Sequence, residues 1–430
     1  MTGSLKTDSL ASALHLAAAA VAEVIAGRSL NEALSQCWRG KGALTAGQRG
    51  AVQDLAYGAL RRYGRDDFYL SKLMDKTPTP AVRALLLVAL ARLEVRPDEA
   101  HTIVDQAVEA VRDVARGQYK ALVNGVLRNF LRRRAELEAA ALQDDVARWQ
   151  HPRWWIARLR RAHPEAWQAI LEAGNGRPPM TLRVNRRRIT ATDFQSRLAG
   201  ADIAARLLDC GALQLERPLS VDRLPGFAEG LCSVQDAGAQ RAAQLLDIHD
   251  GMQVLDACAA PGGKAAHILE TARVDLLALD SDAGRAVRVS ENLLRLGLQA
   301  RVRPADCREV EVWWDGHGFD RILADVPCSA TGVVRRHPDA KWLRRESDIV
   351  QFARVQGEIL DALWRVLVPG GKLLYATCSL FPEENSRQVA AFAARQEDCM
   401  RLSIAGMPEL TLLPSEDHDG FYYALLEKQA

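Results

Sequence analysis

The chain lacks the features that mark several common classes of protein. Its eight cysteines are scattered and contain no C-x-x-C pair, so the sequence suggests neither a disulfide framework nor a structural zinc site. The least polar stretch, residues 10–27, is interrupted by His15 and Glu23 and lacks the basic flank and cleavage pattern of a signal peptide. We therefore expect no membrane-spanning segment, no bound metal and a reduced, cytoplasmic compartment.

The chain also lacks a large excess of either charge. Lys and Arg number 56 against 54 Asp and Glu, a net charge of +2, so the whole-chain charge gives no argument for nucleic-acid binding. Hydrophobic residues make up 48% and charged residues 26%, a balance that excludes disorder throughout the chain. The length of 430 residues corresponds to about three domains of ordinary size, and we expect the chain to be a monomer.

Three regions of different pattern follow one another along the chain. Residues 1–143 are predicted to form an all-α bundle, because apolar residues recur at three- and four-residue spacing, as they do in 102–115. Residues 144–228 are richer in Arg, Pro and Trp and contain a strand-like segment at 180–185, which predicts a linker and a small α+β unit. Residues 229–430 show a third pattern.

In residues 229–430 short apolar strands alternate with amphipathic helices. The strand candidates are residues 253–257, 276–280, 321–325 and 372–377. This alternation is typical of a parallel, doubly wound sheet, so we expect a Rossmann-like α/β domain.

A glycine-bearing turn at residues 254–264 joins the first of these strands to a helix. Its spacing fits neither a P-loop nor the G-x-G-x-x-G pattern. In open α/β sheets such a turn lets a ligand approach the backbone closely. Asp280 ends the next strand, where it would accept ribose hydroxyl protons of a nucleoside cofactor, and Asp306 follows a third candidate strand, near an adenine amino group. These residues alone leave a nucleoside site and a purely structural turn both open.

Two of the predicted strands are followed by a cysteine. Cys328 comes after the strand at 321–325 and Cys378 after the strand at 372–377, so both are expected at the same edge of the sheet. A lone cysteine is most often a small buried hydrophobe, but these two are flanked by small polar residues. A thiolate that adds to carbon 6 of a pyrimidine makes carbon 5 nucleophilic, and a second thiol or base then helps to remove the carbon 5 proton.

Three long segments around these residues resemble the Sun/Fmu-type RNA cytosine-5 methyltransferase family. They are DACAAPGGK at 256–264, DVPCSATGVVRRHPDAKW at 325–342 and ATCSLFPEEN at 376–385. The resemblance covers residues 229–430 and is looser over the rest of the chain. The departures are small: Val326 stands where the family commonly has alanine, and alanines at 265 and 266 stand where it commonly has threonine.

The resemblance implies S-adenosylmethionine as cofactor and a cytosine of small-subunit ribosomal RNA as substrate. Cys378 matches the family's nucleophile, Cys328 matches the cysteine that assists product release, and Asp325 matches a residue that hydrogen-bonds the cytosine. The family's cofactor-binding residues correspond to Cys258, Ala259, Ala260, Pro261, Gly262, Gly263, Lys264, Asp280, Asp306 and Asp325. Lys264 is one candidate for the group that lowers the pKa of the Cys378 thiol.

A local basic region offers a way to hold RNA. Residues 151–188 contain nine arginines against two glutamates, and we interpret this excess as a phosphate-binding surface. Its members are Arg153, Arg158, Arg160, Arg161, Arg177, Arg183, Arg186, Arg187 and Arg188, and beside them Trp149, Trp154, Trp155 and Trp167 would stack on bases or pack in a core. The short segment VNGVL at 123–127 resembles the NusB antitermination factor, which implies a helical RNA-binding domain at 1–143.

Three other functions stay open on the sequence. A DNA cytosine-5 methyltransferase would use the position of Cys328 as its nucleophile and would have no need of Cys378. A non-catalytic RNA-binding, antitermination-like protein would use the α/β domain as a scaffold only. A redox protein would pair Cys328 with Cys378 as a disulfide, but the glycine turn and Asp280 would then have no role.

Overall fold

The structure is a computed structural model, and it describes residues 9–39, 44–115 and 118–430. The chain divides into two compact units. The first comprises Met1–Gly176 and Val334–Arg345, and the second comprises Arg177–Val333 and Glu346–Ala430. The division into three domains at residues 143 and 228 stays a prediction.

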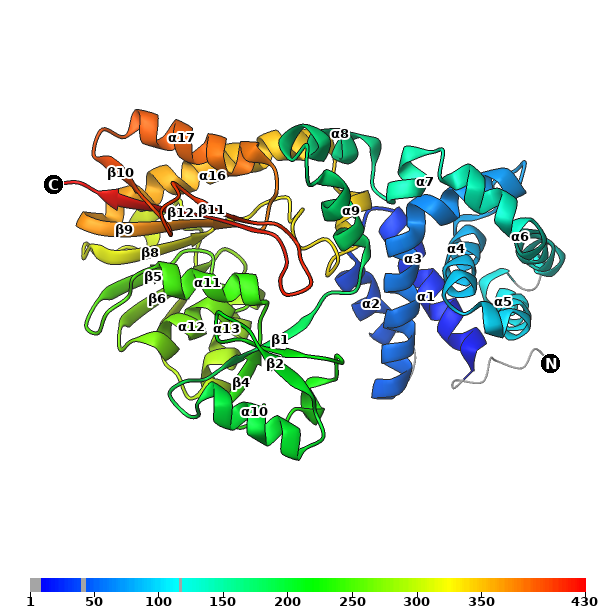
Figure 1. The fold of residues 1–430 in the computed structure, drawn as a ribbon, viewed down its shortest axis with the longest axis horizontal. Helices are drawn as coiled ribbons and strands as arrows, with labels where there is room; N and C mark the ends of the chain where they lie inside the picture. Colours follow the sequence, from blue (N-terminus) through cyan, green and yellow to red (C-terminus); the bar gives the residue numbers. More distant parts are fainter. Residues whose placement is uncertain (1–8, 40–43, 116–117) are drawn as a thin grey trace. The chain divides into compact units, whose positions relative to one another are not determined.

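The first unit is helical and surrounds one apolar core (Figure 1). Its long helices are α1 (Leu10–Ile25), α2 (Leu30–Arg39), α3 (Ala46–Leu73), α4 (Pro80–Val95), α5 (Ala100–Ala115) and α6 (Lys120–Ala141). Helix α4 is the central one, because it is apolar around its whole circumference and is buried almost throughout. A capping box starts α3, since the Thr45 hydroxyl accepts the Gln48 N–H and the Gln48 side chain accepts the Thr45 N–H.

A segment that is distant in sequence completes this unit. Helix α15 (Ala340–Leu343) packs against the same core. The unit also contains the short helices η1 (Pro97–Glu99), α7 (Asp145–Trp149), α8 (Arg153–Ala162) and α9 (Trp167–Asn175). The indole N–H of Trp342 donates to the Leu60 carbonyl at 2.9 Å. The fully buried ammonium of Lys341 donates to the Asn175 side-chain oxygen at 2.8 Å. Residues 334–345 are therefore built into a unit whose other residues all precede position 177.

The second unit contains a small antiparallel sheet with strand order β2-β3-β1-β4. Its strands are β1 (Met180–Val184), β2 (Ala205–Leu207), β3 (Leu213–Leu215) and β4 (Cys232–Val234), accompanied by α10 (Ala191–Gly200) and η2 (Val221–Arg223). Leu182 and Val184 of β1 pack with Phe194 and Leu198 of α10, because alternate strand residues and one face of the helix are apolar.

The large sheet of the second unit has strand order β10-β12-β9-β8-β5-β6-β7, with β11 beside β12. The parallel strands are β5 (Gln253–Asp256), β6 (Asp275–Asp280), β7 (Arg301–Pro304), β8 (Phe319–Asp325) and β9 (Leu367–Thr377). The antiparallel strands are β10 (Cys399–Leu402), β11 (Leu410–Leu412) and β12 (Phe421–Lys428). The chain order reverses between β5 and β8, the place where open α/β sheets bind ligands at the carboxyl ends of their strands.

Helices cover both faces of this sheet (Figure 1). One apolar cluster joins Val254 and Leu323 to helices α11, α12 and α13, and the other joins Leu255 and Ile322 to α14, α16 and α17. The helices are α11 (Ala237–Leu245), α12 (Gly263–Thr271), α13 (Ala283–Leu296), α14 (Val310–Trp313), α16 (Glu346–Val366), α17 (Ser386–Arg395) and the short η3 (Pro382–Glu384). Neighbouring strand residues thus face opposite layers, as the alternation of a strand requires.

The predicted architecture is confirmed: a helical bundle, a small α+β region and a Rossmann-like α/β region follow in that order. The large sheet is mixed, because β12, which the sequence patterns did not reveal, enters antiparallel beside β9 and buries Phe421, Tyr422 and Tyr423. Within the described residues, no helix is both long and apolar enough to cross a membrane.

Candidate active site

A cavity of about 290 Å³ opens at the carboxyl ends of the parallel strands in the second unit. Seven of the predicted site residues line it: Cys258, Ala260, Asp280, Asp306, Asp325, Cys328 and Cys378. They arrive from β5, β6, β7, β8 and β9 or from the loops that follow these strands. The predicted residues Ala259, Pro261, Gly262, Gly263 and Lys264 are not part of this lining.

The loop after β5 is held in place by backbone contacts and by Asp280. The Ala260 N–H donates to the Asp280 carboxylate at 3.2 Å, and the Ala259 N–H donates to the Leu279 carbonyl at 2.8 Å. Gly262 has a φ of 97°, and a Cβ there would lie 3.1 Å from the backbone of Val289. A residue with a side chain would therefore be strained and crowded at this position.

Two carboxylates line the cavity beyond this loop. Asp280 is nearly buried, and its second oxygen accepts the Asp282 N–H at 3.1 Å. Asp306 pairs with Arg308 at 2.7 Å, and this hydrogen bond is the main cause of a lowered pKa for Asp306. Carboxylates beside a nucleoside-sized cavity are suitable acceptors for hydroxyl and amino protons.

The two predicted catalytic thiols lie side by side. Cys328 Sγ is 3.4 Å from Cys378 Sγ, although 50 residues separate them in the chain. The hydrogen bond with Cys378, together with burial, raises the pKa of the Cys328 thiol well above its usual value. Cys328 therefore stays a thiol at neutral pH, which suits a proton-transfer role better than a nucleophilic one.

Lys264 supplies a positive charge beside these groups. Its ammonium lies 2.6 Å from an Asp325 carboxylate oxygen. Burial lowers the pKa of Lys264, but the charges of Asp325, Cys378 and Asp256 more than offset this and raise it above its usual value. The side chain consequently remains protonated and is held against Asp325.

Asp256, at the end of β5, is a buried carboxyl group that the sequence reasoning did not single out. Its side chain is almost fully buried, and neither oxygen has a hydrogen-bond partner among the residues that the structure describes. Burial, together with the charge of Asp325, raises the pKa of Asp256 to about 7. Its place within the matched segment 256–264 was the only sequence signal that could have indicated it.

The raised pKa of Asp256 predicts a pH-dependent stability. Between its ordinary pKa of 3.8 and about 7, the folded protein holds a proton that the unfolded chain has released, so stability falls as pH rises through this window. We expect Asp256→Asn to remove this component, which has a slope of at most about 1.4 kcal/mol per pH unit. Urea unfolding of both proteins at pH 5 and pH 8 measures it, and parallel pH dependences would contradict the prediction.

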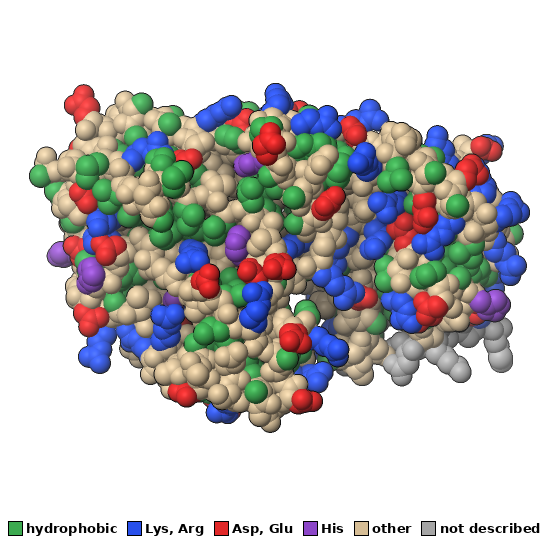
Figure 2. All heavy atoms as spheres, in the orientation of Figure 1, with side chains coloured by type: hydrophobic (Ala, Val, Ile, Leu, Met, Phe, Trp, Pro, Cys, Tyr) green, Lys and Arg blue, Asp and Glu red, His purple; other side chains and the backbone are tan. Residues whose placement is uncertain are grey.

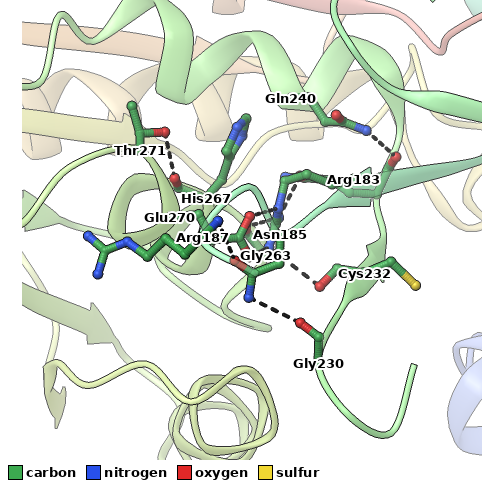
Figure 3. Close-up of polar contacts among 12 residues, drawn as sticks. Arg183, Asn185, Arg187, Gly230, Cys232, Gln240, Gly263, His267, Glu270 and Thr271 are labelled. Atoms are coloured by element: carbon green, nitrogen blue, oxygen red, sulfur yellow. Dashed lines mark hydrogen bonds and ion pairs between the residues drawn. The ribbon is translucent and has the colours of Figure 1, made fainter. Parts of the chain in front are cut away.

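The predicted phosphate-binding surface needs one correction. Arg183 on β1 is buried, and its guanidinium makes a two-point ion pair with Glu270 of α12 at 2.8 and 2.9 Å (Figure 3). The same side chain donates to the Gly263 carbonyl at 2.5 Å. The prediction that Arg183 contacts RNA is therefore wrong, because β1 directs this side chain into the interior of the second unit.

The remaining arginines divide between the two units. Arg153, Arg160 and Arg161 are exposed on α8 of the first unit, whereas Arg186, Arg187 and Arg188 are exposed after β1 of the second unit. Figure 2 shows Lys and Arg side chains interspersed with Asp and Glu over the face that it draws. Trp149 and Trp155 are core residues, since both are buried.

No metal-ligand cluster of three or more His, Cys, Asp or Glu side chains occurs among the described residues.

A serine follows each of the two cysteines, and Glu384 contacts both serines. The sequence analysis assigned no role to Ser329, Ser379 or Glu384, although all three stand inside the matched segments.

Comparison with known proteins identifies three family models along the chain. Residues 243–427 match the 16S rRNA methyltransferase RsmB/F model, 151–222 match the RsmF/B-like ferredoxin-like domain, and 11–132 match the NusB family. The solved structure of PH0851 has the same fold, with a TM-score of 0.81 over 98% of this chain and 99% of that one at 22% identity. A methyltransferase homolog protein from Pyrococcus horikoshii aligns at a TM-score of 0.59 and 26% identity, over 67% of this chain and 99% of its own.

Curated relatives match over nearly the whole length. Ribosomal RNA small subunit methyltransferase B of Vibrio cholerae serotype O1 is 47% identical over 88% of this chain and 89% of its own. The protein of the same name from Erwinia tasmaniensis is 44% identical over 94% of this chain and 95% of its own. With identity of this level along its three regions, the chain belongs to the ribosomal RNA small subunit methyltransferase B family, whose cofactor is S-adenosylmethionine.

Proposed function

We propose that this protein methylates carbon 5 of a cytosine in small-subunit ribosomal RNA through a covalent adduct between Cys378 and carbon 6. The observation that carries the proposal is the pair of thiols, 3.4 Å apart, in the cavity that Asp280 and Asp306 also line. Methylation of an exocyclic amine needs no thiol, because the nitrogen already has a lone pair. Carbon 5 of a pyrimidine has none and needs covalent activation.

The residues around the cavity suit S-adenosylmethionine, which supplies the methyl group when bound. The Asp280 carboxylate ends β6, where it would accept the ribose hydroxyl protons, and Asp306 would accept from the adenine amino group. Gly262 lets the turn pack closely against Val289 of α13, and of this turn Cys258 and Ala260 line the cavity in which the cofactor would bind. Neither carboxylate is needed for the thiol chemistry, so both are free to serve cofactor binding.

Lys264 and Asp325 prepare the attack. The charge of Cys378 helps to raise the pKa of Lys264, so a protonated ammonium accompanies the sulfur during its attack. Asp325 is held by Lys264 at 2.6 Å and lines the cavity, where its carboxylate would accept a hydrogen bond from the cytosine amino group. The same ammonium would offset negative charge on the base as the bond between sulfur and carbon 6 forms.

Cys328 completes the cycle. After carbon 5 has gained the methyl group, its remaining proton must leave so that the carbon 5–carbon 6 double bond can re-form and expel the Cys378 thiolate. In the adduct the Cys378 sulfur is bonded to carbon 6, so the hydrogen bond that chiefly raises the Cys328 pKa is absent. Cys328, once its own proton has passed to water, would then accept the carbon 5 proton as a thiolate. This arrangement assigns attack to Cys378 and release to Cys328.

RNA binding is proposed for surfaces outside the cavity. The exposed arginines of α8 form only long, exposed ion pairs with neighbouring acidic side chains. Arg153 pairs with Asp144 at 3.4 Å, and Arg160 is 4.0 Å from Asp145. Pairs this exposed contribute little, so phosphate groups would compete for these side chains effectively.

Trapping the adduct tests the proposed chemistry. Small-subunit RNA carrying 5-fluorocytosine is incubated with S-adenosylmethionine and the wild-type, Cys328→Ala or Cys378→Ala protein, followed by mass spectrometry. The fluorine cannot leave as a proton does, so we expect a stable adduct on the wild type and on Cys328→Ala, and none on Cys378→Ala.

Two other outcomes have definite meanings. An adduct that is lost in Cys328→Ala and kept in Cys378→Ala would reverse the assignment and favour the mechanism of DNA cytosine-5 methyltransferases. No adduct on any protein that still binds the RNA would favour a non-catalytic, antitermination-like role.

A further inference from the structure

A buried carboxylate connects the two loops that carry the thiols. Glu384, at the end of η3, is fully buried. One of its oxygens accepts the Ser329 N–H at 2.8 Å and the Gln356 side-chain amide at 3.2 Å. The other accepts the hydroxyls of Ser329 and Ser379, both at 2.5 Å.

The two serines are the immediate neighbours of the two thiols. Ser329 follows Cys328, Ser379 follows Cys378, and the serine oxygens lie 3.1 Å apart. A single carboxylate thus fixes both loops at the residue next to each cysteine. The thiols follow the neighbouring strands β8 and β9, whose loops also meet where the Gly332 N–H donates to the Cys378 carbonyl at 2.8 Å. To these contacts Glu384 adds one at the residue that follows each cysteine.

The arrangement of hydrogen-bond donors makes this contact specific for a side chain that accepts at both of its oxygens, as a carboxylate does. All four donors are uncharged, and burial raises the pKa of Glu384 while the hydrogen bonds from the serines oppose that rise. A carboxylate accepts at both oxygens, whereas an amide has one accepting and one donating end. The backbone N–H of Ser329 and the amide of Gln356 can only donate to the Glu384 side chain, so a glutamine at 384 would turn its NH₂ toward the two serine hydroxyls.

We propose that Glu384 is a positioning residue that holds Cys328 and Cys378 at their working separation through Ser329 and Ser379. This inference rests on the proposed function for its catalytic meaning, but the geometric part can be measured without it. Oxidation supplies that measurement, because two adjacent thiols and one hydrogen peroxide give one disulfide and two waters. The rate at which the Cys328–Cys378 disulfide forms therefore reports how often the two sulfurs meet.

The experiment compares the wild type with Glu384→Gln, Ser379→Ala and Glu383→Gln. Glu383 is the matched control, since it is the preceding residue of η3 but is partly exposed and pairs with Arg387 at 3.4 Å. Hydrogen peroxide is added to the full-length protein, and peptide mapping by mass spectrometry follows the Cys328–Cys378 disulfide with time. Single-turnover methylation of RNA and calorimetric binding of S-adenosylmethionine are measured on the same samples.

We expect Glu384→Gln to slow both disulfide formation and the methylation step by about 10–100-fold, the scale associated with displacements near 1 Å. Ser379→Ala should act in the same direction with a smaller effect, because the N–H and the hydroxyl of Ser329 still donate to the Glu384 carboxylate. Cofactor affinity should change less than about twofold in every variant, since no proposed cofactor contact is touched.

The outcomes separate this inference from the proposed function. Unchanged disulfide formation and unchanged methylation in Glu384→Gln would overturn the positioning role while leaving cytosine methylation standing. Slower disulfide formation in a protein that never methylates cytosine would support the positioning role and reject the proposed function. An equal effect of Glu383→Gln would show a general disturbance of η3 and also overturn the inference.

Discussion

Replacing Cys378 with alanine is expected to abolish methyl transfer, lowering the single-turnover rate by on the order of 10⁴-fold or more. Without a thiolate added at carbon 6, carbon 5 of the base is not nucleophilic enough to attack the methyl group. Cys328 does not replace it, because its thiol is buried, and burial raises the pKa of that thiol even where the hydrogen bond with Cys378 is absent. Transfer of labelled methyl groups to small-subunit RNA, with enzyme in excess, measures the effect.

Cys328→Ala is the informative counterpart of that variant. It should transfer one methyl group per enzyme at a nearly normal rate and then stop, because the proposed release step lacks its proton acceptor. Cys399→Ala, on β10 and outside the cavity, is the matched control and should turn over normally. Normal multiple turnover by Cys328→Ala would remove the release role, and residual turnover by Cys378→Ala would remove the nucleophile assignment.

Replacing Arg183 with methionine is expected to lower the free energy of unfolding of the second unit by about 3–5 kcal/mol. Both side chains of the Arg183–Glu270 pair are 3% exposed, so the variant leaves a buried carboxylate without its partner. It also removes the donors to the Gly263 carbonyl and to the Gln235 side chain, at 2.5 and 2.6 Å. Urea-dependent amide hydrogen exchange in β5 and β6 reports the stability of this unit.

A double substitution separates charge from shape. Arg183→Met combined with Glu270→Met should cost clearly less than the sum of the single substitutions, because no unpaired charge remains. Arg354→Met on α16 breaks an exposed pair with Glu358, whose side chains are 63% and 38% exposed, and should cost no more than about 0.5 kcal/mol. A loss below about 1 kcal/mol for Arg183→Met would refute the expected cost of a broken buried pair.

Sequence patterns identified those parts of this protein that are encoded over short stretches of chain. The strands β5, β6 and β8 were expected within two residues of their observed limits, because apolar runs between polar turns are a local property. The strand predicted at 372–377 was too short, since β9 begins at Leu367 and continues through the glycines at 370 and 371. The antiparallel β12 was missed, because an apolar run does not reveal the direction of its neighbour.

The same local logic placed Cys328 and Cys378 at one edge of the sheet. Parallel strands end on the same side, so a cysteine after each of two strands must lie at that edge. The 3.4 Å between the two sulfurs was not predictable, because it depends on β8 and β9 being adjacent and on the contacts of Glu384.

What the sequence determined by itself, then, is the order of the three regions, the methyltransferase fold and the presence of two thiols at strand ends. Only the tertiary structure decided that Arg183 is an interior ion-pair partner and that Lys264 contacts Asp325. It also decided that residues 334–345 belong to the helical unit. The physical reason is sequence separation: Arg183 and Glu270 are 87 residues apart, and Lys264 and Asp325 are 61 apart. Such contacts follow from how strands and helices pack, which no short window of residues specifies.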